Sequence, residues 1–340
     1  MKMQIDLSHT ILETDRLILR PFQESDEQDM YAYASVPGVG EMAGWPHHKS
    51  LQDTREVIRM FMEERNVLAL TLKETGRVIG SIGLHGSWAN KDERYQHLAI
   101  CEIGYVLSRA HWGKGLMPEA VRRMIRFCFE QLHLDAVTVC HFVNNPQSRR
   151  VIEKCGFAFC QKDMFQLKYT TDQVEEMQYI LFRPECREVS CPDERAMIAE
   201  AVLRTLPDWF GIEEATRDYI EKSRQMPLFA LFSGEKALGF GVIKQHFEKS
   251  AEIYVMGLRP EYHGMGLGRQ LMDAMKEYGR ACGIRYLQVK TLDASAGYPQ
   301  YDRTRAFYLS QGFQPLECIP ELWDPGNPCL IMIQNIDLRR

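Results

Sequence analysis

Two glycine-rich turns contain the residues of this 340-residue chain that are best placed to bind a ligand. The first turn reads Trp112-Gly113-Lys114-Gly115-Leu116-Met117, and the second reads His263-Gly264-Met265-Gly266-Leu267-Gly268. Each turn opens a long segment with helical periodicity, which places its backbone N–H groups at a helix N-terminus. Because that end of a helix is partly positive, it favours a phosphate group. The sequence therefore predicts a phosphate-bearing cofactor, with two candidate binding places.

A Gly-Phe pair follows each turn at a similar distance. Gly156-Phe157 comes 41 residues after Gly115, and Gly312-Phe313 comes 46 residues after Gly266. A repeat of this length is a repeated domain rather than a short structural unit. Since 340 residues also suit about two domains, we predict one domain at residues 1–183 and a second at residues 187–340.

Hydrophobic periodicity predicts a similar order of strands and helices in both halves. In the first half, strands are expected at 15–22, 67–73, 77–84, 99–107, 136–142, 157–168 and 176–182, and helices at 24–35, 51–65, after the glycine turn and at 145–155. In the second half, strands are expected at 187–189, 228–232, 238–245, 251–258, 286–291, 313–318 and 329–334, and helices at 192–205, 213–224, 267–282 and 303–311. This order predicts an α/β fold class of the α+β type, in which two tandem domains each have a mostly antiparallel mixed sheet flanked by helices.

The composition excludes several classes of protein. With 45% hydrophobic and 26% charged residues, the chain is typical of a globular protein with sizeable cores, and its net charge of −5 gives no support for nucleic-acid binding. The sequence shows no signal peptide and no apolar run long enough to span a bilayer, so we expect a cytoplasmic protein with no membrane partner. The ten cysteines lack metal-ligand spacing, so we expect no metal and interpret them as mostly buried thiols. The sequence leaves the oligomeric state open, a homodimer included.

Two other nucleotide-binding motifs fit the turns less well. A P-loop needs Ser or Thr after its lysine, but Gly115 follows Lys114, and the second turn has no lysine. A dinucleotide-binding fold places its glycine turn after the first strand, whereas several predicted strands precede both turns here.

With the turns, the Gly-Phe pairs and the duplication, both halves resemble the GNAT family of N-acetyltransferases, over roughly residues 14–183 and 187–336. The family signature is Arg or Gln, two residues, Gly, one residue, then Gly or Ala. The second turn departs from it only at His263, whereas the first departs at Trp112 and also at Met117, whose side chain could crowd the pyrophosphate. The surroundings of the first turn resemble the branch that acetylates ribosomal-protein N-termini, and the second half resembles a general GNAT domain.

The resemblance implies transfer of an acetyl group from acetyl-CoA to a primary amine. The turns would hold the pyrophosphate, Lys114 or Arg269 could add positive charge, and the strand ends near Leu107 and Leu258 would pair with the pantetheine arm. The expected cofactor-binding residues are Leu107, Trp112, Gly113, Lys114, Gly115, Leu116 and Met117, and Leu258, His263, Gly264, Met265, Gly266, Leu267, Gly268 and Arg269.

The resemblance also implies an acid that protonates the departing sulfur. Tyr308 lies four residues before Gly312, where the family commonly has its acid, although the site also suits a core aromatic. The first half has Ile152 at the matching place, so Ser148 and Asn144 are its catalytic candidates, with helix capping as the alternative.

A glutamate on the strand before the turn is a candidate base. Glu252 lies on that strand in the second half, and Glu102 lies on the corresponding strand of the first half. When the strands are aligned at Leu107 and Leu258, the two glutamates are one residue out of step. They would then face opposite sides of the sheet unless a bulge intervenes. We therefore place Glu252, but not Glu102, among the catalytic candidates, with a solvated strand residue or a water relay as alternatives.

The acceptor is a primary amine of a small molecule or peptide that the sequence does not identify further. Two aromatic-rich loops, at residues 44–48 and 297–301, could line the acceptor clefts. Because the second turn keeps its glycines and Tyr308, we predict that the C-terminal site is the more active one. The alternative is that one half, by these residues the N-terminal one, is a non-catalytic acyl-CoA-binding or scaffolding module.

Overall fold

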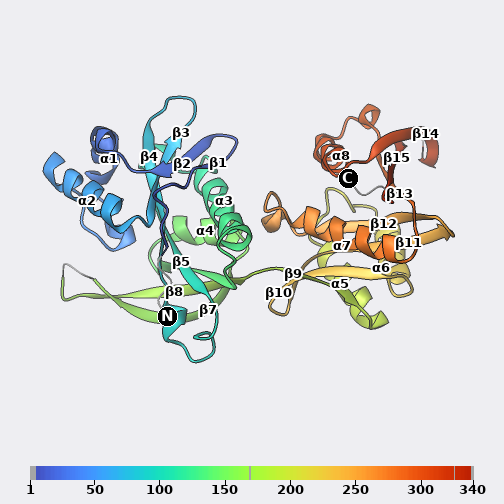
Figure 1. Ribbon diagram of the computed structural model, residues 1–340, viewed down its shortest axis with the longest axis horizontal. Helices are drawn as coiled ribbons and strands as arrows, with labels where there is room; N and C mark the ends of the chain where they lie inside the picture. Colours follow the sequence, from blue (N-terminus) through green and yellow to red (C-terminus); the bar gives the residue numbers. More distant parts are fainter. Residues whose placement is uncertain (1–4, 168–169, 325, 338–340) are drawn as a thin grey trace. The chain divides into compact units, whose positions relative to one another are not determined.

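The computed structural model describes residues 5–167, 170–324 and 326–337. Contacts within the chain divide it into two compact units, Met1–Arg183 and Pro184–Arg340. Each unit has one mixed sheet with helices packed against it (Figure 1). The predicted fold class is confirmed.

The N-terminal sheet has the strand order β1-β2-β3-β4-β5-β6-β8-β7, and among the described strand pairs only β5 and β6 run parallel. Its strands are β1 (Leu12–Glu13), β2 (Leu17–Pro21), β3 (Val67–Leu72), β4 (Val78–Gly86), β5 (Ile100–Leu107), β6 (Ala136–Phe142), β7 (Ala158–Gln166) and β8 (Gln173–Phe182). Its helices are α1 (Glu27–Ala34), α2 (Leu51–Glu64), α3 (Leu116–Glu130) and α4 (Pro146–Lys154), with short 3-10 turns η1 (Glu24–Asp26), η2 (Glu41–Ala43), η3 (Trp88–Lys91) and η4 (Arg109–His111). Figure 1 shows α1 and α2 on one side of the sheet and α3 and α4 on the other.

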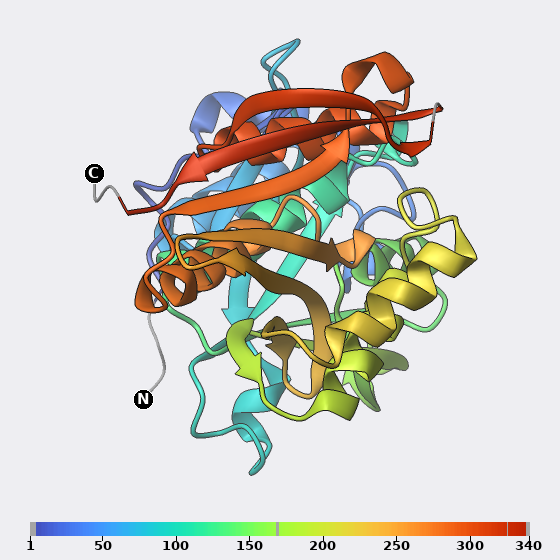
Figure 2. The ribbon, with the colours of Figure 1, turned by 90° about the vertical axis from the view of Figure 1, so that its right-hand side faces the viewer.

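The C-terminal sheet has the order β14-β15-β13-β12-β11-β10-β9, and among its described pairs only β12 and β13 run parallel. Its strands are β9 (Glu185–Val189), β10 (Leu228–Ser233), β11 (Lys236–Phe247), β12 (Ser250–Leu258), β13 (Tyr286–Leu292), β14 (Gln314–Asp324) and β15 (Asn327–Asn335). Its helices are α5 (Pro192–Leu203), α6 (Glu213–Ser223), α7 (Leu267–Ala281) and α8 (Pro299–Ser310), with the 3-10 turns η5 (Pro260–Tyr262) and η6 (Ala294–Ala296). Figure 2 shows β13 and β15 side by side in this unit.

The glycine-turn helix of the N-terminal unit illustrates how the sequence sets its elements. Gly115 caps α3 in the left-handed conformation, and Pro118 lies in the first turn, where its missing N–H breaks no hydrogen bond. One face of the helix is buried along its length, including Val121, Met124 and Cys128. This apolar face, rather than helix propensity, holds α3 and its N-terminus against the sheet.

One edge of each central strand lacks a strand partner near the glycine turn. β5 pairs with β4 as far as Leu107, but its described pairing with β6 stops at Glu102. In the C-terminal unit, β12 continues to Leu258, whereas its described pairing with β13 stops at Ile253. The two strand ends therefore present backbone groups that an extended ligand can pair with.

Matching hydrogen bonds fix which residues of the two sheets correspond. The Ala99 carbonyl accepts from the N–H groups of residues 135 and 136, and the Lys249 carbonyl accepts from those of residues 285 and 286. Counted from these carbonyls, Glu102 and Glu252 are each the third residue along the strand. The two glutamates thus occupy equivalent positions.

A β-bulge in β12 explains why the sequence alignment set the two glutamates out of step. Val255 and Ile253 pair with the adjacent residues Val242 and Ile243, which leaves Tyr254 as an extra residue. β5 pairs with β4 without a register shift. Because of this extra residue, the Glu252 side chain faces the same side of its sheet as Glu102 does in the other unit, which is the case of an intervening bulge.

The prediction of a loop at residues 297–301 is wrong in its second half. α8 begins at Pro299, not at Arg303, with Tyr298 as its N-cap and Pro299 at its first position. Proline is favoured there because the first helical N–H has no intrahelical acceptor. Tyr301 is therefore helical, and its hydroxyl donates to the Trp209 carbonyl at 3.1 Å.

Candidate active site

Each glycine turn has the backbone geometry of an anion-binding helix start. Gly113 and Gly115 have φ of 75°, and Gly264 and Gly266 have φ of 79° and 81°. Only glycine adopts this region without strain, and neither helix has a side-chain cap at its N-terminus. The first N–H groups of α3 and α7 therefore remain available to a phosphate.

Trp112 and His263 secure the turns to the preceding strands. The Trp112 ring N–H donates to the Leu107 carbonyl at 2.8 Å, and His263 Nε2 lies 2.7 Å from the Leu258 carbonyl. Since a carbonyl only accepts, His263 has its proton on Nε2 in this contact. These residues replace the Arg or Gln of the family signature, and their ring N–H groups hold the turn in place.

Met117 is accommodated by an exchange of volume with the neighbouring helix. It is 4% exposed in α3, so its side chain is buried. At the matching Gly268, an added Cβ would lie 3.0 Å from Phe307 Cε2 of α8. Phe307 lies five residues before Gly312, and Val151 of α4 lies five residues before Gly156. Val151 is therefore the residue of the N-terminal unit that corresponds to Phe307. A side chain at 268 would therefore require Phe307 to shift, whereas the corresponding residue of α4 is the smaller Val151.

A cavity of about 490 Å³ runs from the first glycine turn along the free edge of β5. It contains part of every element expected to hold the cofactor in this unit. Its lining residues are Val39, Met42, Ala43, Glu102, Ile103, Gly104, Tyr105, Val106, Leu107, His111, Trp112, Gly113, Gly115, Leu116, Met117, Pro118, Cys140, His141, Phe142, Asn145, Gln147, Ser148, Arg150, Val151, Lys154, Phe165 and Glu176. Of the cofactor residues predicted for this half, Lys114 does not line the cavity; its carbonyl accepts from Arg16 at 3.0 Å.

Glu102 is a half-buried carboxyl group at this cavity. Its pKa is raised from the ordinary value of 4.5 to about 7, mainly by burial; a hydrogen bond from Cys140 opposes this rise, and the nearby charge of Glu176 adds to it. The Cys140 thiol lies 3.4 Å from Glu102 Oε2. A carboxyl with a pKa near 7 can exchange protons at neutral pH, which is the property of a general base.

Ser148 and Tyr105 form a pair of hydroxyl groups on the wall of the cavity. Their oxygens are 2.8 Å apart, and burial raises the pKa of Tyr105, so its hydroxyl keeps its proton. Asn144 is exposed and does not line the cavity, whereas Asn145 does. Asn145 caps α4 by accepting from the Ser148 N–H at 3.0 Å. Ser148 thus lies at the cavity and Asn144 does not, and their predicted catalytic roles stay predictions.

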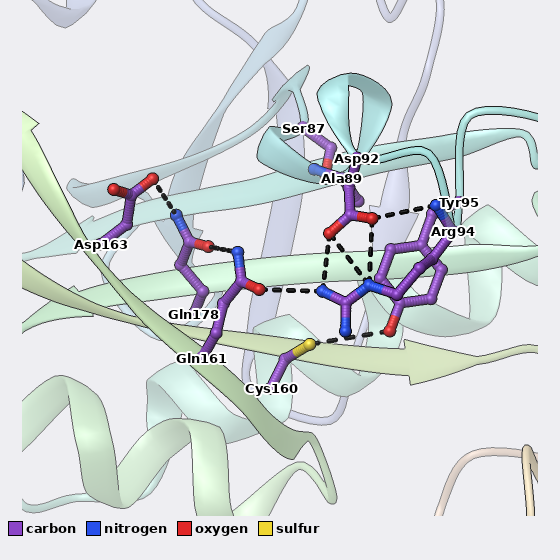
Figure 3. Close-up of polar contacts among 9 residues, drawn as sticks. All are labelled: Ser87, Ala89, Asp92, Arg94, Tyr95, Cys160, Gln161, Asp163 and Gln178. Atoms are coloured by element: carbon purple, nitrogen blue, oxygen red, sulfur yellow. Dashed lines mark hydrogen bonds and ion pairs between the residues drawn. The ribbon is translucent and has the colours of Figure 1, made fainter.

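A chain of side-chain amides on β7 and β8 ends at Glu176. Figure 3 shows the part of this chain formed by Gln161 and Gln178, with Arg94 and Asp163. Gln178 accepts from Gln161 Nε2 at 2.9 Å and donates to Asp163 at 3.4 Å and to Glu176 at 2.7 Å. Gln161 in turn accepts from Arg94 at 2.9 Å. Because two carboxylates use the N–H groups of Gln178, its amide has a fixed orientation.

Glu252, the predicted base of the second half, has different surroundings. It is 4% exposed, and its carboxylate lies 2.7 Å from His246 Nε2 and 3.0 Å from Lys290 Nζ. Both carboxylate oxygens therefore already have partners. Glu102 has the same strand position, but among the described residues it has no Lys or Arg ion pair.

Tyr308 is buried in an aromatic cluster. Its ring lies 5.3 Å from that of Phe307 and 5.7 Å from that of Phe313. It is 7% exposed, and burial raises its pKa. This geometry fits both readings of the sequence, a proton donor and a core aromatic.

The aromatic loop at residues 44–48 contributes to the cavity only through the residues just before it. Met42 and Ala43 line the cavity, whereas Trp45 packs into a buried cluster with Val39 and lies 5.3 Å from the His48 ring. His47 instead pairs with Glu41 at 2.7 Å.

Two functional candidates have no motif in the sequence. Glu176 and Cys140 reach the cavity from β8 and β6 through the strand order β5-β6-β8. Glu102 was excluded by the apparent offset of one residue. Searching each half for the glutamate nearest the parallel ladder would have found it.

Among the residues that the structure describes, no group of His, Cys, Asp or Glu could hold a metal ion, and no helix is long and apolar enough to cross a membrane. The ten cysteines are free. Four of them are buried and three are exposed, so the interpretation as buried thiols holds only in part. The buried ones are Cys101, Cys128, Cys155 and Cys329, and the exposed ones are Cys191, Cys282 and Cys318.

Comparisons with known proteins define both units as acetyltransferase domains. Residues 16–158 match the model of the acetyltransferase (GNAT) domain, and residues 195–313 match that of the acetyltransferase (GNAT) family. The chain belongs to the GNAT family of N-acetyltransferases, with one domain of the family in each half.

Three relatives illustrate this relationship. The uncharacterised N-acetyltransferase YoaA of Bacillus subtilis (strain 168) is 31% identical over 43% of this chain and 82% of its own length. The proposed ribosomal N-acetyltransferase YdaF of the same strain is 33% identical over 35% of this chain and 64% of its own length. The mycothiol acetyltransferase of Corynebacterium glutamicum (strain R) is 38% identical over 22% of this chain and 27% of its own length. A GNAT acetyltransferase structure from Bacillus anthracis matches 51% of this chain and 98% of its own, at 20% identity and a TM-score of 0.44.

Proposed function

We propose that the N-terminal unit transfers the acetyl group of acetyl-CoA to a primary amine of a small molecule or peptide. One observation carries this proposal: Glu102, a half-buried carboxyl whose pKa is raised to about 7, lines a cavity that also contains the glycine turn. A cofactor site and a base matched to neutral pH thus share one cavity, which is what amine acetylation requires.

The residues present fit acetyl-CoA, which supplies the acetyl group as a thioester. The open N–H groups between Gly113 and Met117 suit the pyrophosphate, and Lys154 and Arg150 on the cavity wall add positive charge. The unpaired edge of β5 suits the amide groups of the pantetheine arm.

Three side chains would move the protons. Glu102 takes a proton from the ammonium group of the acceptor, which gives the nitrogen its nucleophilic lone pair. Ser148, hydrogen-bonded to Tyr105, is placed to donate a proton to the departing sulfur. Glu176, held by Gln178, keeps a second carboxylate at the cavity to attract the cationic amine.

An amine screen with the full chain tests the proposal. Release of coenzyme A is measured across primary amines and peptides, and kcat/KM for the best amine is followed from pH 5.5 to 8.5. Because Glu102 acts only after it has lost its proton, kcat/KM should rise with pH and level off above an apparent pKa of about 7. Acetyl-CoA binding without acetylation of any amine would refute the proposal.

The C-terminal unit is a second candidate for the same reaction. It has its own glycine turn and Tyr308, and the prediction that its site is the more active one stays a prediction. The alternative, that one half only binds acyl-CoA or acts as a scaffold, is compatible with the ion-paired state of Glu252. Calorimetry with the full chain separates these cases, since two acetyl-CoA molecules bound per chain would show that both turns bind, and one would support a scaffold.

A further inference from the structure

The two ends of the N-terminal cavity have opposite charge. Lys154 ends α4 beside the glycine turn, because the adjacent Cys155 thiol donates to the Pro118 carbonyl at 3.7 Å. Glu102 and Glu176 line the cavity where β5, β6 and β8 lie side by side. The positive end suits a phosphate-bearing cofactor, so the acidic end is left for the acceptor.

The two carboxyl groups of the acidic end lack ion-pair partners among the described residues. Among the described residues, no Lys or Arg forms an ion pair with Glu102 or Glu176. Glu176 instead accepts a hydrogen bond from the side-chain amide of Gln178, which is 1% exposed and therefore buried. A cationic amine would be attracted here, whereas a substrate carboxylate would be repelled.

An aromatic wall lies beside these carboxylates, since Phe142 on β6 is the direct cross-strand partner of Glu176 on β8. The rings of Phe142 and Phe165 are 5.6 Å apart and tilted by 50°, and both line the cavity together with Val39 and Met42. Side chains of this kind favour an apolar group by removing its surface from water.

The loop that completes this wall is held in place by specific contacts. Asn145 Nδ2 donates to the Met42 carbonyl at 3.2 Å. Gly44, with φ of 85°, packs so closely that an added Cβ would lie 3.4 Å from Phe165 Cε1 and 3.6 Å from Phe142 Cζ. The wall is therefore preorganised by contacts from three separate parts of the chain, which reduces the entropy lost on binding.

We propose that the acceptor is a primary amine joined to an apolar group of aromatic size, with no carboxylate beside the amine. This inference rests on the proposed acetyl transfer at the N-terminal cavity. Arylalkylamines meet this description. Peptide N-termini with an aromatic first residue also meet it, because they have an amide where a free amino acid has its carboxylate.

Four amines test the inference with the full chain and acetyl-CoA: 2-phenylethylamine, ethylamine, phenylalanine amide and phenylalanine. We expect kcat/KM for 2-phenylethylamine to exceed that for ethylamine at least about tenfold, as is usual when a hydrophobic pocket accepts a larger group. We expect phenylalanine amide to exceed phenylalanine by at least about tenfold in kcat/KM, because only the free acid brings a carboxylate of its own to the two glutamates. The ratio of 2-phenylethylamine to phenylalanine amide then distinguishes a small-molecule acceptor from a peptide terminus.

Phe165→Ala should lower kcat/KM for 2-phenylethylamine about tenfold and that for ethylamine less than about threefold, and Phe165→Leu should retain most of the preference. Met164→Ala is the matched control, since Met164 is adjacent on β7, 53% exposed and outside the cavity lining. Equal use of phenylalanine and its amide, or an equal loss for both amines in Phe165→Ala, would overturn the inference and leave acetyl transfer standing. If no amine is acetylated although acetyl-CoA binds, the proposed function fails and the inference fails with it.

Discussion

The two units place a glutamate at the same position of the same strand order but surround it differently. Glu102 meets a thiol and a second carboxylate, whereas Glu252 meets His246 and Lys290. Burial without a cation raises the pKa of Glu102 to about 7. An equivalent position in the fold is therefore not sufficient to assign a base, because the groups that surround the two carboxyls differ.

The two glycine turns differ at the last position of the family signature, which is Met117 in the first turn and Gly268 in the second. The smaller residue, Gly268, lies beside the larger Phe307. In the N-terminal unit the larger Met117 is combined with the smaller Val151 at the corresponding place. A departure from a family signature can therefore be a packing exchange. Whether a small residue is needed at this place depends on the side chain that the neighbouring helix packs against it.

Glu102→Gln should have the largest effect on the comparison. If Glu102 is the base, its amide should lower kcat for the best amine about 100- to 10,000-fold, the usual range for removal of general acid–base help. The rise of kcat/KM with pH near 7 should disappear at the same time. The measurement is coenzyme A release across the pH range.

Glu252→Gln is the matched variant in the other unit and should change this activity much less. If Glu252→Gln abolishes turnover and Glu102→Gln does not, the active base lies in the C-terminal unit and the assignment reverses.

The same two variants should change the stability of the protein at pH 8 in opposite directions. Glu102 has a raised pKa, so the folded protein holds a proton that the unfolded chain releases, and stability falls as the pH rises from 4.5 to about 7. Glu102→Gln removes this loss and should be more stable than wild type at pH 8 by up to about 3 kcal/mol. The gain should be absent at pH 4.

Urea unfolding at the two pH values measures this difference. Glu252→Gln should instead be destabilised at pH 8, because it takes the charged partner from Lys290 and His246. An equal shift of Glu102→Gln at both pH values would mean that Glu102 has an ordinary pKa in the folded protein.

The volume exchange predicts coupling between α7 and α8. Gly268→Met should destabilise the C-terminal unit by about 1–3 kcal/mol, since a side chain there meets Phe307. Adding Phe307→Val should recover part of that loss, whereas Phe307→Val alone should leave a cavity and destabilise the protein. A double-mutant cycle measured by thermal unfolding checks the sign. Additive effects would show that Phe307 does not explain the glycine.

The sequence was sufficient for the fold but only in part for the site. Strands, helices and the repeat follow from local periodicity, and the glycine turns follow from residue type. The bulge at Tyr254 could not be predicted, because it depends on how β12 pairs with β11, and without it the alignment set Glu102 and Glu252 one residue out of step. Glu176 reaches the cavity only through strand order, so no local pattern indicated it. The start of α8 at Pro299 was predictable from proline at a first helical position.

Tyr308→Phe should have the smallest effect of these variants. It tests whether the C-terminal unit uses the Tyr308 hydroxyl as its proton donor. If the C-terminal unit also transfers acetyl groups, losing the hydroxyl should lower turnover on its amine at least about tenfold, since the sulfur would lose its proton donor. The ring would still pack against Phe307 and Phe313, so thermal stability should stay nearly unchanged. Ser148→Ala is the matched change in the N-terminal unit, and its effect should appear on the amine that depends on Glu102. Unchanged turnover of every amine in Tyr308→Phe would make Tyr308 a core aromatic and leave the N-terminal cavity as the place where proton transfer is organised.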